Sequence, residues 1–156
     1  MQGNPRIIGL LNNLLSLELR AINQYFLHAK MCENWGYERM AKRLRDQSLA
    51  EMKDAEELVD RVLYFDGLPN LQRFDGFIVG ESVAEQLQLA LELENEAVAL
   101  IGSVMQACIE EGDTGTREFL APKLLDEQTH VSWIESQLTL VKQIGEANYL
   151  TQQVRE

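Results

Sequence analysis

The chain has 156 residues, 46% of them hydrophobic and 25% charged, with a net charge of −11. This composition is typical of a single globular domain spanning residues 1–156. The negative charge argues against nucleic acid and anionic membrane surfaces as partners. No apolar run approaches the roughly 18 residues of a membrane span, and residues 1–5 lack a signal-peptide pattern, so we expect a cytoplasmic protein. Cys32 and Cys108 are too few for a disulfide framework and are expected to stay reduced.

Helical periodicity runs through almost the whole chain, and turn residues divide it into five segments. Asn4 before Pro5 is a good N-cap followed by a favoured first-turn proline. Ser82 and Glu85 form a capping box that opens the third segment. The expected helices cover approximately residues 5–35, 37–65, 82–111, 116–144 and 147–155.

The connections between these helices predict the topology. The first and second helices, and likewise the third and fourth, are joined by short turns and must be antiparallel neighbours. The stretch 67–81 is long enough to span roughly 50 Å when extended, whereas a helix of about 29 residues is about 44 Å long. The second and third helices can therefore be parallel. We predict an all-α four-helix bundle with one long crossover between helices two and three and a short fifth helix.

Pro122 is expected to disturb the fourth helix. A proline inside a helix removes one backbone hydrogen bond and clashes with the preceding turn. Either the helix bends at Pro122 or it begins later than residue 116, and we expect a bend near Glu127.

Acidic residues recur at a fixed interval in the two halves of the chain. Three pairs of positions are each separated by 76 residues: Glu18 and Glu94, Glu51 and Glu127, and Asp54 and His130. Each half thus offers one lone Glu and one pair at i, i+3, a spacing that puts both side chains on one helix face.

Acids from four helices that meet inside a bundle are costly to bury unless cations neutralise them. A single helical Glu is usually a solvated surface residue, and the repeated interval together with flanking apolar residues such as Leu17 and Leu93 argues against that alternative. Ferritin-like di-iron proteins use a Glu from each of two helices and Glu-x-x-His from the other two. Carboxylates with an imidazole suit iron or manganese better than calcium. The pattern predicts a two-metal site.

Several blocks of the chain resemble bacterioferritin, the haem-containing branch of the ferritins, over essentially the whole length. The matching blocks are AINQYFLHA at 21–29, EMK at 51–53, GLPNLQ at 67–72 and NYL at 148–150. The resemblance implies a shell of 24 subunits that oxidises Fe(II) at a di-iron centre and stores a ferric mineral. It also implies haem b shared between two subunits, each contributing a methionine.

The resemblance assigns roles to two further residues. Met52 matches the haem-binding methionine, and one residue after Glu51 it should point sideways out of the bundle. Its ordinary alternative is a flexible side chain in a dimer interface. Tyr25 matches a tyrosine beside the di-iron centre, and its alternative is a core aromatic. His28 is expected to be a structural or surface residue rather than a ligand. Trp133 is expected to be a packing residue, and its alternative is a redox role.

Asp54 stands where the family has a histidine. A fifth carboxylate would bring the ligand set to −5 against the +4 of two ferrous ions, so some pKa values in the metal-free site must rise. Asp54 is also shorter than histidine and could fall short of the ion that Glu18 holds. Gln47 and Ala50 replace acidic residues of the family and suggest poorer transfer of iron to the cavity.

Three functions are compatible with the sequence. The first is a ferroxidase subunit, in which Glu51 and Glu127 bridge the ions. The remaining ligands are then terminal: Glu18 with Asp54, and Glu94 with His130. The second is a haem-carrying, weakly catalytic subunit that assembles with a second bacterioferritin or ferritin subunit type. The third is a structural bundle without redox chemistry. A ferredoxin reductant is compatible with the resemblance but has no signal in the chain.

Overall fold

The computed structural model describes residues 1–155, and the helices account for most of them. The helices are α1 (Pro5–Asn34), α2 (Glu38–Tyr64), α3 (Val83–Glu111), α4 (Thr114–Ile144) and α5 (Glu146–Thr151). The prediction of an all-α bundle is confirmed. No helix in the described part of the chain is both long and apolar enough to cross a membrane.

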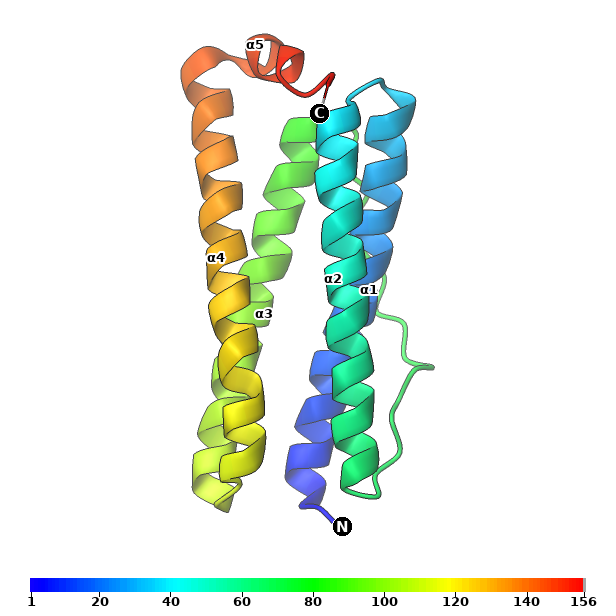
Figure 1. Ribbon diagram of the computed structural model, residues 1–156, viewed down its shortest axis with the longest axis vertical. Helices are drawn as coiled ribbons and strands as arrows, with labels where there is room; N and C mark the ends of the chain where they lie inside the picture. Colours follow the sequence, from blue (N-terminus) through cyan, green and yellow to red (C-terminus); the bar gives the residue numbers. More distant parts are fainter. Residues whose placement is uncertain (156) are drawn as a thin grey trace.

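The four long helices lie side by side, and the predicted crossover is present (Figure 1). Helix α1 runs antiparallel to α2, and α3 runs antiparallel to α4, whereas α2 and α3 point in the same direction. The segment 65–82 between them travels back along the length of the bundle, beside α1. The short helix α5 crosses the end of the bundle where α4 finishes.

Local capping explains where the helices begin. The side chain of Asn4 accepts a hydrogen bond from the Arg6 amide at 2.8 Å. At α3, Ser82 Oγ accepts from the Glu85 amide at 3.2 Å. The Glu85 carboxylate accepts in return from the amide of Glu81, one residue before the N-cap. The contacts to Arg6 and Glu85 satisfy amides that the first helical turn leaves free, and the contact to Glu81 satisfies the amide just before the N-cap.

Two helix boundaries differ from the prediction. Helix α4 begins at Thr114 rather than near residue 116, and the side chain of Asp113 caps it. The fifth helix ends at Thr151 rather than near 155, because the Gln153 carbonyl accepts from the Arg39 amide at 2.9 Å and ties the tail to the start of α2. Helix α4 runs through Pro122, so a later start is excluded. The bend remains a prediction.

The hydrophobic core consists of two clusters stacked along the bundle axis. One cluster includes Tyr25, Leu44 and Ile134, and the other includes Leu11 and Leu120. On α2 and α4, the positions of the predicted ligands fall between the residues of the two clusters, and on α1 and α3 Glu18 and Glu94 directly follow Leu17 and Leu93 of the first cluster. The acids are therefore held in a layer with apolar packing on either side.

His28 fixes the crossover to α1. Its side chain is buried, and Nε2 accepts a hydrogen bond from the Gly80 amide at 3.0 Å. Burial lowers the pKa of His28 to about 4, so the imidazole is neutral at pH 7 and able to accept this bond. His28 thus has a structural role, because its hydrogen-bond partner is Gly80 of the crossover and not a residue of the acidic layer.

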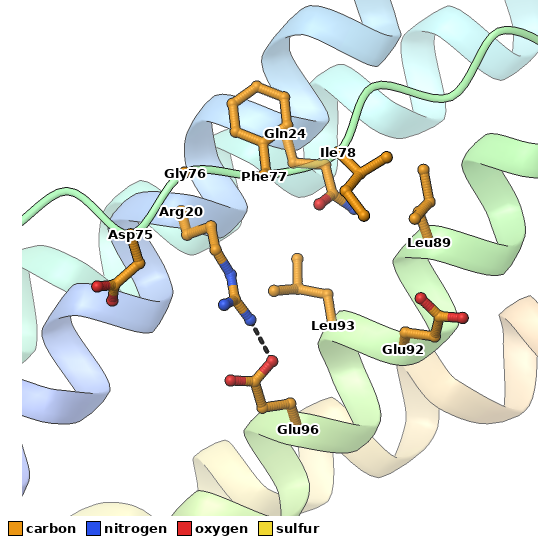
Figure 2. Close-up of a pocket in the computed structure, with 10 residues that line it drawn as sticks. All are labelled: Arg20, Gln24, Asp75, Gly76, Phe77, Ile78, Leu89, Glu92, Leu93 and Glu96. Carbon is orange, nitrogen blue, oxygen red and sulfur yellow. Dashed lines mark hydrogen bonds and ion pairs between the residues drawn. The ribbon is translucent and has the colours of Figure 1, made fainter.

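A pocket on the outer side of α1 and α3 is separate from the acidic layer (Figure 2). Residues 75–78 of the crossover form one wall, and Gln24 and Leu93 contribute from the two helices. Arg20 reaches across it to form an ion pair with Glu96, also 76 residues apart in sequence. None of the predicted metal ligands lines this pocket. The ion pair joins the two related helices on the side facing the crossover.

Candidate metal centre

Each of the four long helices contributes one glutamate to the buried layer. The exposed fractions are 5% for Glu18, 1% for Glu51, 1% for Glu94 and 4% for Glu127. Carboxylates are almost never buried to this degree without a partner. Because Glu18, Glu51, Glu94 and Glu127 belong to α1, α2, α3 and α4 in turn, the antiparallel pairing brings widely separated positions to the same height.

Four carboxylates meet at the centre of this layer. Ligand oxygens of Glu18, Glu51, Asp54 and Glu127 all lie within 4.8 Å of one another. Asp54, which replaces the expected histidine, is thus close enough to belong to the group, despite its shorter side chain. A single cation placed among these oxygens would contact several of them.

Glu94 and His130 lie beside this cluster and are linked through Tyr25. The Tyr25 hydroxyl donates to Glu94 Oε1 at 2.6 Å and lies 3.1 Å from His130 Nε2. His130 Nε2 is also 3.9 Å from Glu94 Oε1. Both predicted ligands therefore face the interior of the bundle, and Tyr25 is their shared hydrogen-bond partner.

Polar atoms without partners are concentrated in this centre. Among the described residues, five buried side-chain atoms have no hydrogen-bond partner. Four of them are Glu18 Oε2, Glu94 Oε2, Glu127 Oε2 and His130 Nδ1, and the fifth belongs to Gln24. Buried polar atoms are normally satisfied, so this concentration calls for an explanation. Divalent cations bound by the three carboxylate oxygens would supply the missing interactions, and the donor set of carboxylates plus imidazole fits iron.

Burial and mutual repulsion shift the protonation of these groups. Burial, followed by repulsion from Glu51 and Asp54, raises the pKa of Glu127 to about 9. Burial and the neighbouring Glu51 raise the pKa of Glu18 well above its usual range. Without a cation, the folded protein must hold protons here, as expected when several acids share one low-dielectric site.

His130 and Tyr25 are shifted toward their neutral forms. Burial, with a contribution from Arg43, lowers the pKa of His130 to about 4. Burial and the nearby glutamates raise the pKa of Tyr25 well above its usual range. A neutral imidazole is the form that coordinates a metal ion, and a neutral phenol retains the hydroxyl proton that it donates to Glu94.

Lys123 is the residue of this region that sequence reasoning missed. It is only 8% exposed, and its ammonium forms ion pairs with Asp54 at 3.1 Å and with Glu57 at 2.5 Å. The sequence did indicate that Lys123 lies near the acidic cluster, because it is four residues before Glu127 and therefore on the same helix face. Its counterpart 76 residues earlier, Gln47, donates to Glu51 Oε1 at 2.8 Å.

Trp133 and Met52 lie at the edges of the site. The Trp133 ring stacks on His130 with centroids 5.8 Å apart, and the Arg43 guanidinium lies 4.1 Å from the centroid of the Trp133 ring. Met52, next to the buried Glu51, is 49% exposed. Met52 therefore points outward from the bundle, as its position one residue after the buried Glu51 predicted.

Comparison with known proteins identifies the family. A family model described as a ferritin-like domain matches residues 8–144. A bacterioferritin of Mycobacterium leprae is 43% identical over 152 residues, covering 97% of this chain and 96% of that protein. A bacterioferritin of Streptomyces coelicolor is 42% identical, covering 97% of this chain and 90% of that protein. A bacterioferritin of Brucella melitensis is 39% identical, covering 96% of this chain and 92% of that protein. The helical architecture and the sequence matches agree, and the chain belongs to the bacterioferritin family.

Proposed function

We propose that this protein stores iron and that its buried acidic centre oxidises Fe(II) to Fe(III). The observation that carries the proposal is the meeting of four carboxylates from α1, α2 and α4 within 4.8 Å, with apolar clusters on either side. The family membership supports iron as the cation. The unpartnered oxygens of Glu18, Glu94 and Glu127 support binding rather than a purely structural role.

In this proposal, Fe(II) is the substrate, and two ions bind side by side. Glu51 and Glu127 would bind both ions. Glu18 and Asp54 would bind one of the two ions, and Glu94 and His130 would bind the other. The two ions give up two electrons to oxygen, which takes up two protons and leaves as hydrogen peroxide. With hydrogen peroxide as the oxidant, the same two electrons and two protons yield two water molecules. Tyr25 holds Glu94 and His130 in place through its hydroxyl group. The Fe(III) products then move to the stored mineral.

The rate of Fe(II) oxidation tests this function. We expect the purified protein to oxidise Fe(II) at least about a hundredfold faster than the variant Glu18→Ala, Glu127→Ala, because positioning and charge stabilisation at the site are lost together. Glu110→Gln is the control, because Glu110 lies in a solvated ion pair with Arg6, 16 residues after Glu94 on α3, and this variant should oxidise normally. Equal rates for the wild type and the double variant would remove the proposal.

The outer surface of α1 and α2 supports a shell that carries haem b. Phe26, Leu49 and Met52 are between 49% and 60% exposed, and Phe26 and Leu49 line a groove between the two helices. An exposed apolar patch of this kind fits a partner surface, and a thioether beside it would suit an apolar porphyrin whose iron accepts a sulfur ligand. Met52 would supply that ligand, and a second copy of the chain would supply its equivalent.

The proposed assembly is the 24-subunit shell of the family, in the cytoplasm. Further apolar side chains on the crossover, such as Phe74 and Ile78, are 71% exposed and would be covered by neighbouring subunits. A second subunit type and a ferredoxin reductant remain compatible with this assembly, and they are separate predictions.

A second candidate function is a haem-carrying subunit with weak oxidation activity. The observation that favours it is the ion pair between Lys123 and Asp54, because a cation already stands beside one of the proposed ligands. This candidate predicts full haem binding with oxidation little faster than in the double variant above. A structural bundle without redox chemistry predicts neither iron nor haem in protein from iron-rich medium.

A further inference from the structure

The two halves of the centre differ in the residue at i+3 from the bridging glutamate, Asp54 on α2 and His130 on α4. On α4, the residue three positions after Glu127 is His130, which is neutral and hydrogen-bonded to Tyr25. On the α2 side, the partner is Asp54, and one of its oxygens is held by the ammonium of Lys123. The 76-residue symmetry is therefore broken at this one ligand and at the residue facing it.

The position of the ammonium decides what it can affect. Among the described residues, the ion pairs of Lys123 are with Asp54 and Glu57, and not with the glutamates of the cluster. Asp54 is therefore the member of the carboxylate cluster that the ammonium contacts directly. The side chain of Asp54 is 24% exposed and that of Lys123 is 9% exposed, so water screens this pair only partly.

The ion pair between Lys123 and Asp54 lowers the affinity for a bound cation in two ways. First, the hydrogen bond from Lys123 uses one lone pair of Asp54 Oδ1, so this oxygen is a weaker donor to a cation in the cluster. Second, the positive charge behind Asp54 reduces the attraction that this carboxylate exerts on a divalent ion. The number of charged oxygen ligands is one of the main determinants of affinity at such sites. Both effects weaken binding at the Asp54 side.

We propose that Lys123 is a positioning residue that lowers the affinity of the Asp54 side of the centre for divalent cations, acting through Asp54. The proposal rests on the metal binding proposed above. It makes the ion held by Glu18 and Asp54 the more weakly bound of the two, and the ion held by Glu94 and His130 the more tightly bound. The His130 side thus fills first.

Anaerobic titration with Co(II), followed by its visible absorption, tests this inference without relying on catalysis. We expect two Co(II) ions per subunit, one bound more weakly. In Lys123→Met and in Lys123→Gln, the weaker step should tighten about tenfold or more, the scale of a lost charged hydrogen bond. Glu57→Gln is the matched control, because it removes the other partner of the same ammonium and should not tighten the step.

The pair of variants Asp54→Ala and Asp54→Ala, Lys123→Met tests the route of the effect. If Lys123 acts through Asp54, removing the ammonium in this background should change the affinity less than about threefold. Unchanged or weaker Co(II) binding in both Lys123 variants, with normal thermal unfolding, would overturn the inference. Equal tightening with and without Asp54 would also overturn it. Absence of Co(II) binding in the wild type would instead refute the proposed metal centre, and this inference with it.

Discussion

Replacing Glu127 by glutamine is expected to stabilise the metal-free protein at pH 7.5 by on the order of 3 to 4 kcal/mol and to have little effect near pH 4.5. The folded-state pKa of Glu127 is about 9, above its ordinary value of 4.5. Between these values the folded protein keeps a proton that the unfolded chain releases. The stability that this group contributes is therefore fully present below pH 4.5 and is lost as the pH rises toward 9. Glutamine stays neutral throughout and avoids the loss.

Urea unfolding of the metal-free protein at several pH values between 4.5 and 8 measures this difference. The buried histidines act in the opposite direction, because the pKa values of His28 and His130 are lowered to about 4. Their contribution is lost as the pH falls below 6.5, but both proteins share it and it cancels in the comparison. A stability difference that does not change with pH would show that Glu127 is ionised in the folded state and would contradict the described centre.

Replacing Met52 by leucine is expected to abolish haem binding. Leucine keeps the apolar volume of the exposed patch but removes the sulfur that would coordinate the haem iron. The wild type should bind one haem for two subunits after reconstitution with haemin, as read from the absorption spectrum. The variant should retain less than about a tenth of that amount, because a haem without axial ligands is held only by apolar contacts.

Met40→Leu provides the matched control for this measurement. Met40 is on the same helix but only 2% exposed, within the core, so its replacement by a residue of similar volume should leave haem binding intact. Fe(II) oxidation measured in the same Met52 variant separates the two candidate functions, since the acidic centre is unchanged. Full haem content in Met52→Leu would refute the assignment of this residue.

The fold and most of the centre could be predicted because the signals are repeated and local. Helical periodicity and the capping residues Asn4 and Ser82 indicated where helices begin. The length of the stretch 67–81 predicted a crossover, and the structure confirms it. The 76-residue interval predicted that Glu51 and Glu127 meet, and their carboxylates do lie in one cluster. Matched positions in antiparallel helix pairs lie at the same height, which is why the interval is informative.

The parts that could not be predicted depend on contacts between helices. The sequence does place Lys123 on the helix face of Glu127, but it does not indicate that the ammonium crosses to α2, since a lysine on a helix is usually solvated. The hydrogen bond from Gly80 to His28 depends equally on the path of the crossover. The early end of α5 follows from the bond between Gln153 and Arg39, which are 114 positions apart (from 39 to 153). Periodicity within one segment contains no information on such partners.

X-ray anomalous scattering from crystals soaked anaerobically with Fe(II) tests the central claim most directly. We expect two peaks per subunit in the acidic layer, one within bonding distance of Glu18, Glu51 and Glu127, and a stronger one beside Glu94 and His130. Peaks confined to exposed carboxylates, with none among the buried glutamates, would contradict the proposed centre.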